Sequence, residues 1–308
     1  MRHATGTGQD RASQAYDAPV GDPTAHLAHV HMTPSEPVRN THATCDGRLR
    51  DCHPMTDYDR PVSLPMLQWG IKGRQRALLL HGLSSSAATW WRIADGLAAD
   101  GYHVSAPDLR GHGNAPRTSS YRLSGYAADL WALGGGWDVV VGHSLGGTLA
   151  TLIAADAGFT RRLVLLDPVF MIPEDQFGGL LADQLAELDH AGDPDAVAAR
   201  NPGWHPEDAA LKARAATQTS RYVVERTLED NRPWWYLDLL GDVRITTDIL
   251  SADPANGTLF DPTIGDEIAR RNARITARLL RGVGHSIQRE APGTVLDVLL
   301  AEHSTYRR

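Results

Sequence analysis

Gly142-His143-Ser144-Leu145-Gly146 follows the pattern Gly-x-Ser-x-Gly and stands between an apolar run at 138–141 and an apolar helical stretch at 145–157. A serine placed in this way, between a strand and a helix, is typical of a sharp turn that exposes its hydroxyl at the carboxyl edge of a sheet. Such a turn strains the backbone of the serine and leaves no space for side chains at positions 142 and 146. The free N–H groups at the start of the next helix also favour a developing oxyanion. The sequence therefore predicts that Ser144 is a nucleophile.

Short apolar runs alternate with helical stretches on both sides of this motif. This alternation indicates βαβ units and a parallel sheet. The predicted strands cover residues 77–80, 102–107, 138–141, 163–166, 245–252 and 275–280, and the predicted helices cover residues 87–99, 124–133, 145–157, 264–272 and 292–302. The predicted fold class is therefore α/β, with a doubly wound, mostly parallel sheet.

The alternation stops between residues 171 and 240, where only helical patterns occur. We interpret 171–240 as a helical cap inserted after the fourth predicted strand, so that the α/β core covers residues 60–170 and 241–308. Residues 1–59 are polar, contain scattered prolines and show no sustained period of 2 or 3.6 residues. They are predicted to form a flexible N-terminal extension.

Composition excludes several classes of function. The 30 lysines and arginines against 37 aspartates and glutamates give a formal net charge of −7, so the chain lacks the basic field that gathers nucleic acid. No apolar run has the length of a membrane span or the form of a signal peptide. Two cysteines, Cys45 and Cys52, are too few for a disulfide framework, and their spacing to His42 and His53 differs from that of structural zinc sites. We expect a cytoplasmic protein with no membrane span, nucleic-acid partner or metal.

Further motifs accompany the Ser144 motif in a fixed order. His81-Gly82-Leu83 follows the first predicted strand, residues 107–113 follow the second, and Gly284-His285 follows the last. With these motifs, residues 77–300 resemble the α/β-hydrolase superfamily. The resemblance implies a cofactor-independent hydrolase whose catalytic triad runs Ser, acid, His along the chain. It disfavours the epoxide hydrolases and haloalkane dehalogenases of this fold, which use an aspartate where this chain has Ser144.

A serine hydroxyl becomes a good nucleophile only when an imidazole accepts its proton and a carboxylate holds that imidazole in place. The resemblance assigns the base to His285, in the loop after the last predicted strand. For the acid it favours Asp253, which follows the strand before the histidine strand and lies in a turn that can lean toward His285. Asp167 is the alternative, because some members of the superfamily place the acid one strand earlier. Asp248 and Asp261 are further candidates.

Two backbone N–H groups are expected to bind the oxyanion, one from Leu145 after the nucleophile and one from Leu83 in the loop after the first strand. Residues at the strand ends and aromatic residues of the cap are expected to line the substrate pocket. They are His81, Gly82, His143, Trp234, Trp235 and Tyr236, with Trp204, Phe170, Met171 and Phe177 completing an apolar wall.

The aromatic cap favours a hydrophobic substrate. The leading hypothesis is hydrolysis of a carboxylic ester or lactone through an acyl-enzyme on Ser144, without a cofactor. A carbon–carbon bond hydrolase, a perhydrolase and a slow-turnover ligand receptor of this fold would all keep the same triad, so they stay as alternatives. The expected partner is a small hydrophobic ester or lactone, and an edge of the cap or the final helix is a candidate homodimer surface.

Overall fold

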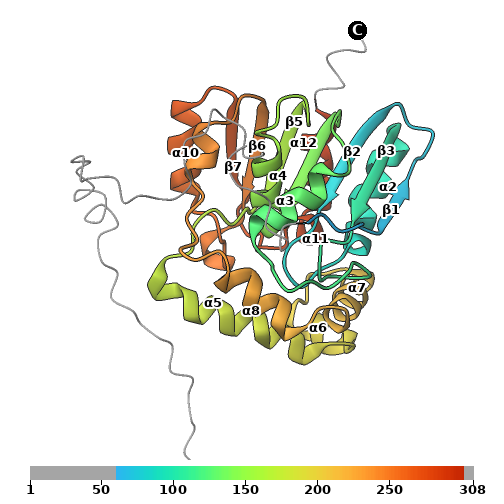
Figure 1. Ribbon diagram of the computed structural model, residues 1–308, viewed down its shortest axis with the longest axis vertical. Coiled ribbons are helices and arrows are strands. Elements are labelled where there is room, and N and C mark those ends of the chain that lie inside the picture. The colour runs from blue at the N-terminus through green and yellow to red at the C-terminus, as the bar shows by residue number, and fades with distance from the viewer. Residues whose placement is uncertain (1–59, 302–308) are drawn as a thin grey trace, which may run out of the picture. The chain divides into compact units, whose positions relative to one another are not determined.

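The computed structural model describes residues 60–301, which form one sheet covered by helices (Figure 1). The predicted extension, residues 1–59, lies outside the described residues. Seven strands hydrogen-bond in the order β1-β3-β2-β4-β5-β6-β7. Their bounds are β1 Met66–Trp69, β2 Gln75–Leu80, β3 Tyr102–Pro107, β4 Val139–His143, β5 Arg162–Leu166, β6 Thr246–Ser251 and β7 Ile275–Leu279. All neighbours are parallel except β1, which runs antiparallel to β3. The predicted α/β fold with a mostly parallel sheet is confirmed.

Strand β1 is the strand that the sequence analysis missed. It has four residues, and its apolar side chains Met66 and Leu67 are exposed. A short edge strand of this kind carries no periodic burial pattern to read. The structure pairs it with β3 from Met66 opposite Pro107 to Trp69 opposite Val104.

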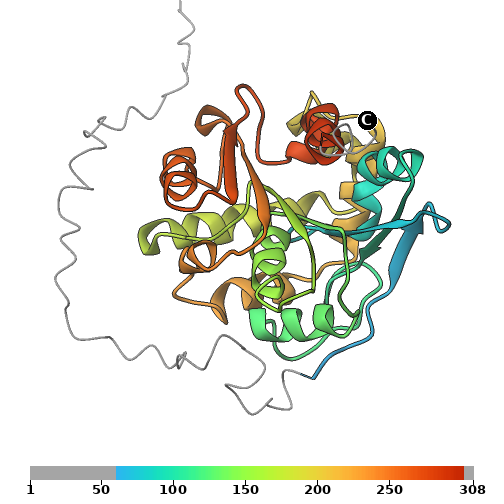
Figure 2. The ribbon, with the colours of Figure 1, turned by 90° about the horizontal axis from the view of Figure 1, so that it is seen from above.

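Successive residues of a strand point to opposite faces of the sheet. Because the central strands are apolar along most of their length, both faces of the sheet are apolar. In β2, Leu78 and Leu80 belong to one hydrophobic cluster, and Ala77 and Leu79 belong to the other. Figure 2 shows the two helical layers, with α3 and α4 on one side and α2 and α12 on the other. The helices of the core are α2 Trp91–Ala99, α3 Leu123–Trp131, α4 Leu145–Ile153, α10 Pro262–Arg271, α11 Ile287–Glu290 and α12 Pro292–Leu300, with short 3-10 helices η3 Ala87–Trp90 and η5 Pro254–Asn256.

A second group of helices lies between β5 and β6 in the chain. These cap helices are α5 Glu174–Ala186, η4 Glu187–His190, α6 Pro194–Arg200, α7 Pro206–Thr217, α8 Arg221–Glu229 and α9 Asp238–Gly241. In Figure 1 they lie below the sheet. Hydrogen bonds from Lys212 to Ser84 O and from Trp234 to Val169 O join this part of the chain to loops that follow β2 and β5. The helices seen in residues 60–301 all fall short of the length and apolarity that crossing a bilayer requires.

The turn between β4 and α4 is the tightest point of the core. A carbon added at Gly142 would lie 2.2 Å from the carbonyl oxygen of Gly146, and one added at Gly146 would lie 2.1 Å from that of Leu80. Ser144, between them, has φ +55° and ψ −121°, a conformation that L-residues rarely adopt. The predicted strain at Ser144 and the predicted need for glycine on both sides of it are therefore confirmed.

Gly146→Ala is expected to lower the free energy of unfolding by about 2–4 kcal/mol, because the backbone of β2 must move to admit the methyl group. Gly178→Ala, in α5, is the matched control. An added carbon at Gly178 meets nothing within 4 Å, so this change should raise the stability by about 0.5–1 kcal/mol. Urea denaturation measures both, and an unchanged midpoint for Gly146→Ala would contradict the close approach.

Candidate active site

Ser144 connects β4 to α4 with both of its peptide groups fixed. Its N–H donates to the carbonyl of Leu166 in β5 (3.0 Å), and its own carbonyl accepts the N–H groups of Gly147 and Thr148 in the first turn of α4. The serine is buried, with 7% of its surface exposed. The backbone therefore fixes where Ser144 lies, at the carboxyl end of β4.

His285 lies in the loop between β7 and α11 and is held by a carboxylate. Its Nδ1 is 2.6 Å from Oδ2 of Asp167. Because an ionised carboxylate only accepts hydrogen bonds, Nδ1 carries the proton and Nε2 of the neutral ring keeps a lone pair. The ring is 26% exposed, whereas Asp167 is fully buried. His285 is thus held with Nε2 on the side of the ring away from Asp167.

Asp167 receives hydrogen bonds at both carboxylate oxygens. Oδ1 accepts from the N–H of Ala252 and the hydroxyl of Thr258, and Oδ2 accepts from the N–H of Leu259 and from His285. Burial by itself raises the pKa of Asp167, but the hydrogen bonds from His285, Leu259 and Thr258 outweigh it, so the pKa lies below the usual value. The carboxylate is therefore ionised at neutral pH.

The choice of Asp253 as the partner of His285 is wrong. Its Oδ1 accepts the N–H of Ala255 and its Oδ2 accepts the N–H of Gly282. These backbone hydrogen bonds lower the pKa of Asp253 and tie the start of η5 to the turn after β7. Both aspartates follow a strand, and only the direction of the side chain distinguishes them: Asp253 faces its own turn, whereas Asp167 faces His285.

The further acid candidates are also occupied elsewhere. Asp248 forms a buried ion pair with Arg162 (2.7 Å) within the sheet. Asp261 accepts the N–H and hydroxyl of Thr263 and caps the start of α10. Neither carboxylate is directed at the base.

His143 supports the loop that carries the base. Its Nε2–H donates to the backbone carbonyl of His285 (3.0 Å), and the two ring centroids lie 4.7 Å apart. Burial, the largest cause, holds the pKa of His143 well below its usual value. This residue was expected to line the pocket, and the structure places it directly between the nucleophile turn and the histidine loop.

Glu290 supports the same loop from the other side, and sequence reasoning missed it. Its Oε2 accepts the N–H of Gly284 (2.6 Å), the residue before His285. A carbon added at Gly284 would lie 2.8 Å from Oε1 of the same carboxylate. No motif marks this contact, because it arises only when the loop folds back on α11.

The loop after β2 lies against Ser144, where the sequence analysis expected it. A carbon added at Gly82 would lie 3.0 Å from Cβ of Ser144. His81 fixes this loop, since its Nε2 accepts the N–H of Leu109 (3.0 Å) and its Nδ1–H donates to the carbonyl of Gly82 (2.8 Å). Burial lowers the pKa of His81 to about 4. Because a trans peptide is planar, holding the Gly82 oxygen on one side directs the N–H of Leu83 to the other.

The expected aromatic wall divides into buried and exposed parts. Trp234 is buried and donates its indole N–H to the carbonyl of Val169 (2.8 Å), and Tyr236 packs edge-on against it with centroids 5.7 Å apart. Trp235 is 58% exposed. Trp234 therefore lies near the chain that follows Asp167, whereas the ring of Trp235 faces solvent and does not line an enclosed pocket.

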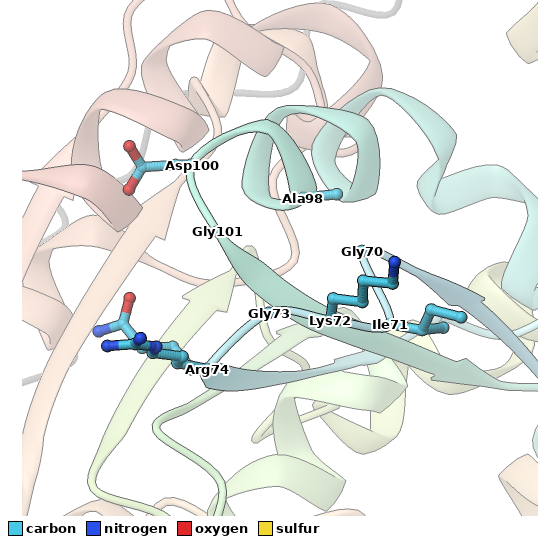
Figure 3. Close-up of a pocket in the computed structure, with 9 residues that line it drawn as sticks. Gly70, Ile71, Lys72, Gly73, Arg74, Ala98, Asp100 and Gly101 are labelled. Carbon is cyan, nitrogen blue, oxygen red and sulfur yellow. The ribbon is translucent and has the colours of Figure 1, made fainter.

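A hollow of about 840 Å³ lies at another place on the core (Figure 3). It is lined by the turn between β1 and β2, residues 70–75, and by Ala98, Asp100 and Gly101 at the end of α2. These residues precede β2 and β3, so the hollow is at the amino edge of the sheet. Ser144 and His285 are at the carboxyl edge, and the hollow is therefore not their substrate site.

The structure offers no metal site within residues 60–301, where no group of three or more His, Cys, Asp or Glu side chains is placed to hold an ion. The sequence candidates Cys45, Cys52, His42 and His53 lie outside the described residues. The chemistry available at the carboxyl edge is that of a serine, a histidine and a carboxylate.

Comparisons with known proteins place this geometry in a family. Residues 77–298 match the model of the Alpha/beta hydrolase family. The chain is 33% identical over 153 residues to lipase LipV of Mycobacterium tuberculosis, a match that covers 48% of this chain and 58% of the lipase. It is 27% identical over 300 residues to epoxide hydrolase A of the same organism, covering 78% of this chain and 93% of that enzyme.

Solved structures share the fold. E-2-(acetamidomethylene)succinate hydrolase superposes with a TM-score of 0.65 at 21% identity, covering 77% of this chain and 98% of that one. Because the family model spans most of the chain, and strands β3 to β7, the turn at Ser144 and the loop at His285 fall within it, the chain belongs to the alpha/beta hydrolase family.

Proposed function

We propose that this protein is a serine hydrolase that cleaves a carboxylic ester or lactone, with Ser144, His285 and Asp167 as its catalytic triad. The observation that carries the proposal is the 2.6 Å hydrogen bond between the buried carboxylate of Asp167 and Nδ1 of His285. His143, the residue before Ser144, donates a hydrogen bond to the backbone carbonyl of this histidine, and Ser144 itself has the strained backbone (φ +55°) of a nucleophile turn.

Each residue has a defined step in this reaction. Oγ of Ser144 attacks the carbonyl carbon while Nε2 of His285 accepts the hydroxyl proton. His285 returns that proton to the leaving alkoxide as the ester bond breaks, which leaves an acyl-enzyme. A water deprotonated by the same nitrogen then attacks the acyl group and releases the carboxylic acid. Asp167 keeps the other proton on Nδ1 and stabilises the imidazolium.

Two backbone N–H groups are available for the oxyanion. Leu145 is the first residue of α4, so its N–H has no acceptor within the helix. The N–H of Leu83 belongs to the peptide whose oxygen His81 holds, in the loop beside Ser144. Preorganised donors of this kind are worth about 3–4 kcal/mol of transition-state stabilisation each.

Acyl transfer fits the nucleophile better than epoxide opening does. Ser144 stands at the position where the epoxide hydrolases of this fold carry an aspartate, although the chain is similar to epoxide hydrolase A along most of its length. The similarity to a lipase agrees with a serine nucleophile. Val169 and Phe170, which follow Asp167 in the chain, and Trp234 of the cap are buried in the main hydrophobic cluster, so the surroundings of the acid are apolar.

Ser144→Ala is expected to reduce the turnover of p-nitrophenyl butyrate by at least about 10³-fold, because no other group can form the acyl-enzyme. Labelling by a fluorophosphonate should also disappear, while the circular dichroism spectrum stays unchanged. Ser63→Ala, at an exposed serine, should keep both the ester turnover and the fluorophosphonate labelling of the wild type.

Two results would contradict this proposal. Fluorophosphonate labelling that persists in Ser144→Ala would place the nucleophile elsewhere. Acylation of the wild-type chain that stops after one equivalent would indicate a ligand receptor rather than an esterase.

The assignment of the acid is tested by comparing two asparagine variants. Asp167→Asn should lower kcat by about 10²-fold or more, because the amide cannot hold the tautomer of His285 that leaves Nε2 as the base. Asp253→Asn should leave kcat within about 10-fold of the wild type, since its carboxylate serves a turn. The reverse pattern, measured on the same ester, would restore Asp253 as the acid.

The ionised state of Asp167 has its own test in stability. Its folded pKa lies below the unfolded value of about 3.9, so the ionised carboxylate stabilises the fold above that pH and loses this contribution as the pH falls through the folded pKa. The difference in unfolding free energy between the wild type and Asp167→Asn should therefore be largest near pH 7 and shrink below about pH 4. Urea denaturation at several pH values measures it, and a difference that grows toward acid would contradict an ionised Asp167.

A further inference from the structure

Lysine is rare in this chain, and one of its two lysines is buried near the candidate active site. Among 30 basic residues only Lys72 and Lys212 are lysines. Lys72 is exposed in the turn between β1 and β2. Lys212, in cap helix α7, has a side chain that is only 11% exposed. Burying an ammonium group costs free energy unless charged and polar partners compensate it. The contacts of Lys212 therefore show what its burial serves.

The ammonium of Lys212 joins the cap to the loop after β2. Its Nζ donates to the backbone carbonyl of Ser84 (3.0 Å) and pairs with the carboxylate of Glu187 in η4. Both charged residues come from the cap helices, whereas Ser84 belongs to the core. Glu187 thus supplies the countercharge within the cap. Lys212 also donates a hydrogen bond to one carbonyl of the core, that of Ser84.

That carbonyl belongs to a strained residue next to a proposed oxyanion donor. Ser84 has φ +54° without being a glycine, a conformation that persists only where neighbouring contacts hold it. It follows Leu83 directly. His81 holds the carbonyl of Gly82 and Lys212 holds that of Ser84, so the peptide chain is anchored on both sides of the Leu83 N–H.

A second cation holds the next residue of this loop. Arg289, in α11 after the catalytic histidine loop, donates to the hydroxyl of Ser85 (3.2 Å) and to that of Ser286 (2.9 Å). Trp204 of the cap covers its guanidinium, 4.6 Å from the ring centroid. The loop is therefore fixed between the cap on one side and the histidine loop on the other.

We propose that Lys212 is a positioning residue for the oxyanion donor Leu83, and that the cap thereby completes the oxyanion site. This inference rests on the proposed serine hydrolase function. A donor that is misplaced by about 1 Å at a reacting centre can cost about 10²-fold in rate. Lys212 does not touch the substrate carbonyl; it acts through the backbone of Ser84.

Lys212→Met tests this role, because the methionine keeps an unbranched apolar stem and removes the ammonium. For hydrolysis of p-nitrophenyl butyrate, kcat should fall by about 10–50-fold while KM changes by less than about 3-fold. The inhibition constant of phenylboronic acid, whose serine adduct places a tetrahedral oxygen at the oxyanion site, should rise by a factor similar to the loss in kcat/KM.

Two further variants separate positioning from simple attachment of the cap. Lys212→Arg keeps a cationic donor and should recover much of the lost kcat and of the boronic acid affinity. Arg214→Met, at an exposed position two residues along the same helix, should leave kcat, KM and inhibition unchanged. Thermal denaturation of each variant, followed by circular dichroism, shows whether a loss of activity merely follows a loss of folded protein.

The outcomes distinguish this inference from the proposed function. If the wild type turns over the ester and is labelled on Ser144, but Lys212→Met retains full kcat and full boronic acid affinity, the positioning role is overturned. It is also overturned if Lys212→Met raises KM and lowers the melting temperature without a specific loss in kcat, or if Lys212→Arg recovers nothing. Absence of labelling at Ser144 in the wild type would instead overturn the hydrolase itself, and the oxyanion role of Lys212 with it.

Discussion

The buried carboxylate of Asp167 is the interaction on which the geometry of the candidate site depends. A charge without contact to solvent is tolerated only when its oxygens are fully hydrogen-bonded. Those bonds come from three segments of the chain: Ala252 after β6, the loop at Leu259, and His285 after β7. The hydrogen bonds that compensate the charge of Asp167 therefore also fix the chain after β6 and after β7, and they set the tautomer of His285. The orientation of the His285 ring follows from that network and not from the histidine loop alone.

The sequence could predict what depends on local chain geometry. The Gly-x-Ser-x-Gly turn needs glycines because a carbon at position 146 would strike the backbone of β2, and this constraint acts within one strand, one turn and one helix. The acid could not be chosen in this way. Asp167 and Asp253 both follow a strand, and the direction of each side chain depends on which backbone N–H groups lie nearby after folding. Glu290 and Lys212 reach the site from α11 and from the cap, and no spacing in the chain marks such contacts.

Neutral histidines build the frame around the one histidine that works as a base in the proposed mechanism. Burial lowers the pKa of His81 to about 4 and that of His112 to about 3. His81 must be neutral, because its Nε2 accepts the N–H of Leu109. In a protonated ring Nε2 would carry a hydrogen of its own and could not accept this bond. His143 likewise uses one N–H to hold the backbone of His285. Buried histidines such as His81 and His143 thus stay neutral and hold backbone groups in place. His285, which faces the carboxylate of Asp167, is the histidine that transfers a proton in the proposed mechanism.

The contacts between cap and core are of two kinds, apolar and polar. Trp234, near the C-terminal end of the cap, is buried in the main hydrophobic cluster. Separating it from the core would expose apolar surface to water, which is unfavourable. At α7 the contacts are polar: Asp208 pairs with Arg92 and accepts the indole N–H of Trp91, and Lys212 binds the loop after β2. Asp208 and Lys212 are almost fully buried, so each charge depends on these partners for compensation. At α7 the cap is therefore held to the core through charged side chains, and one of them, Lys212, acts directly on the loop after β2.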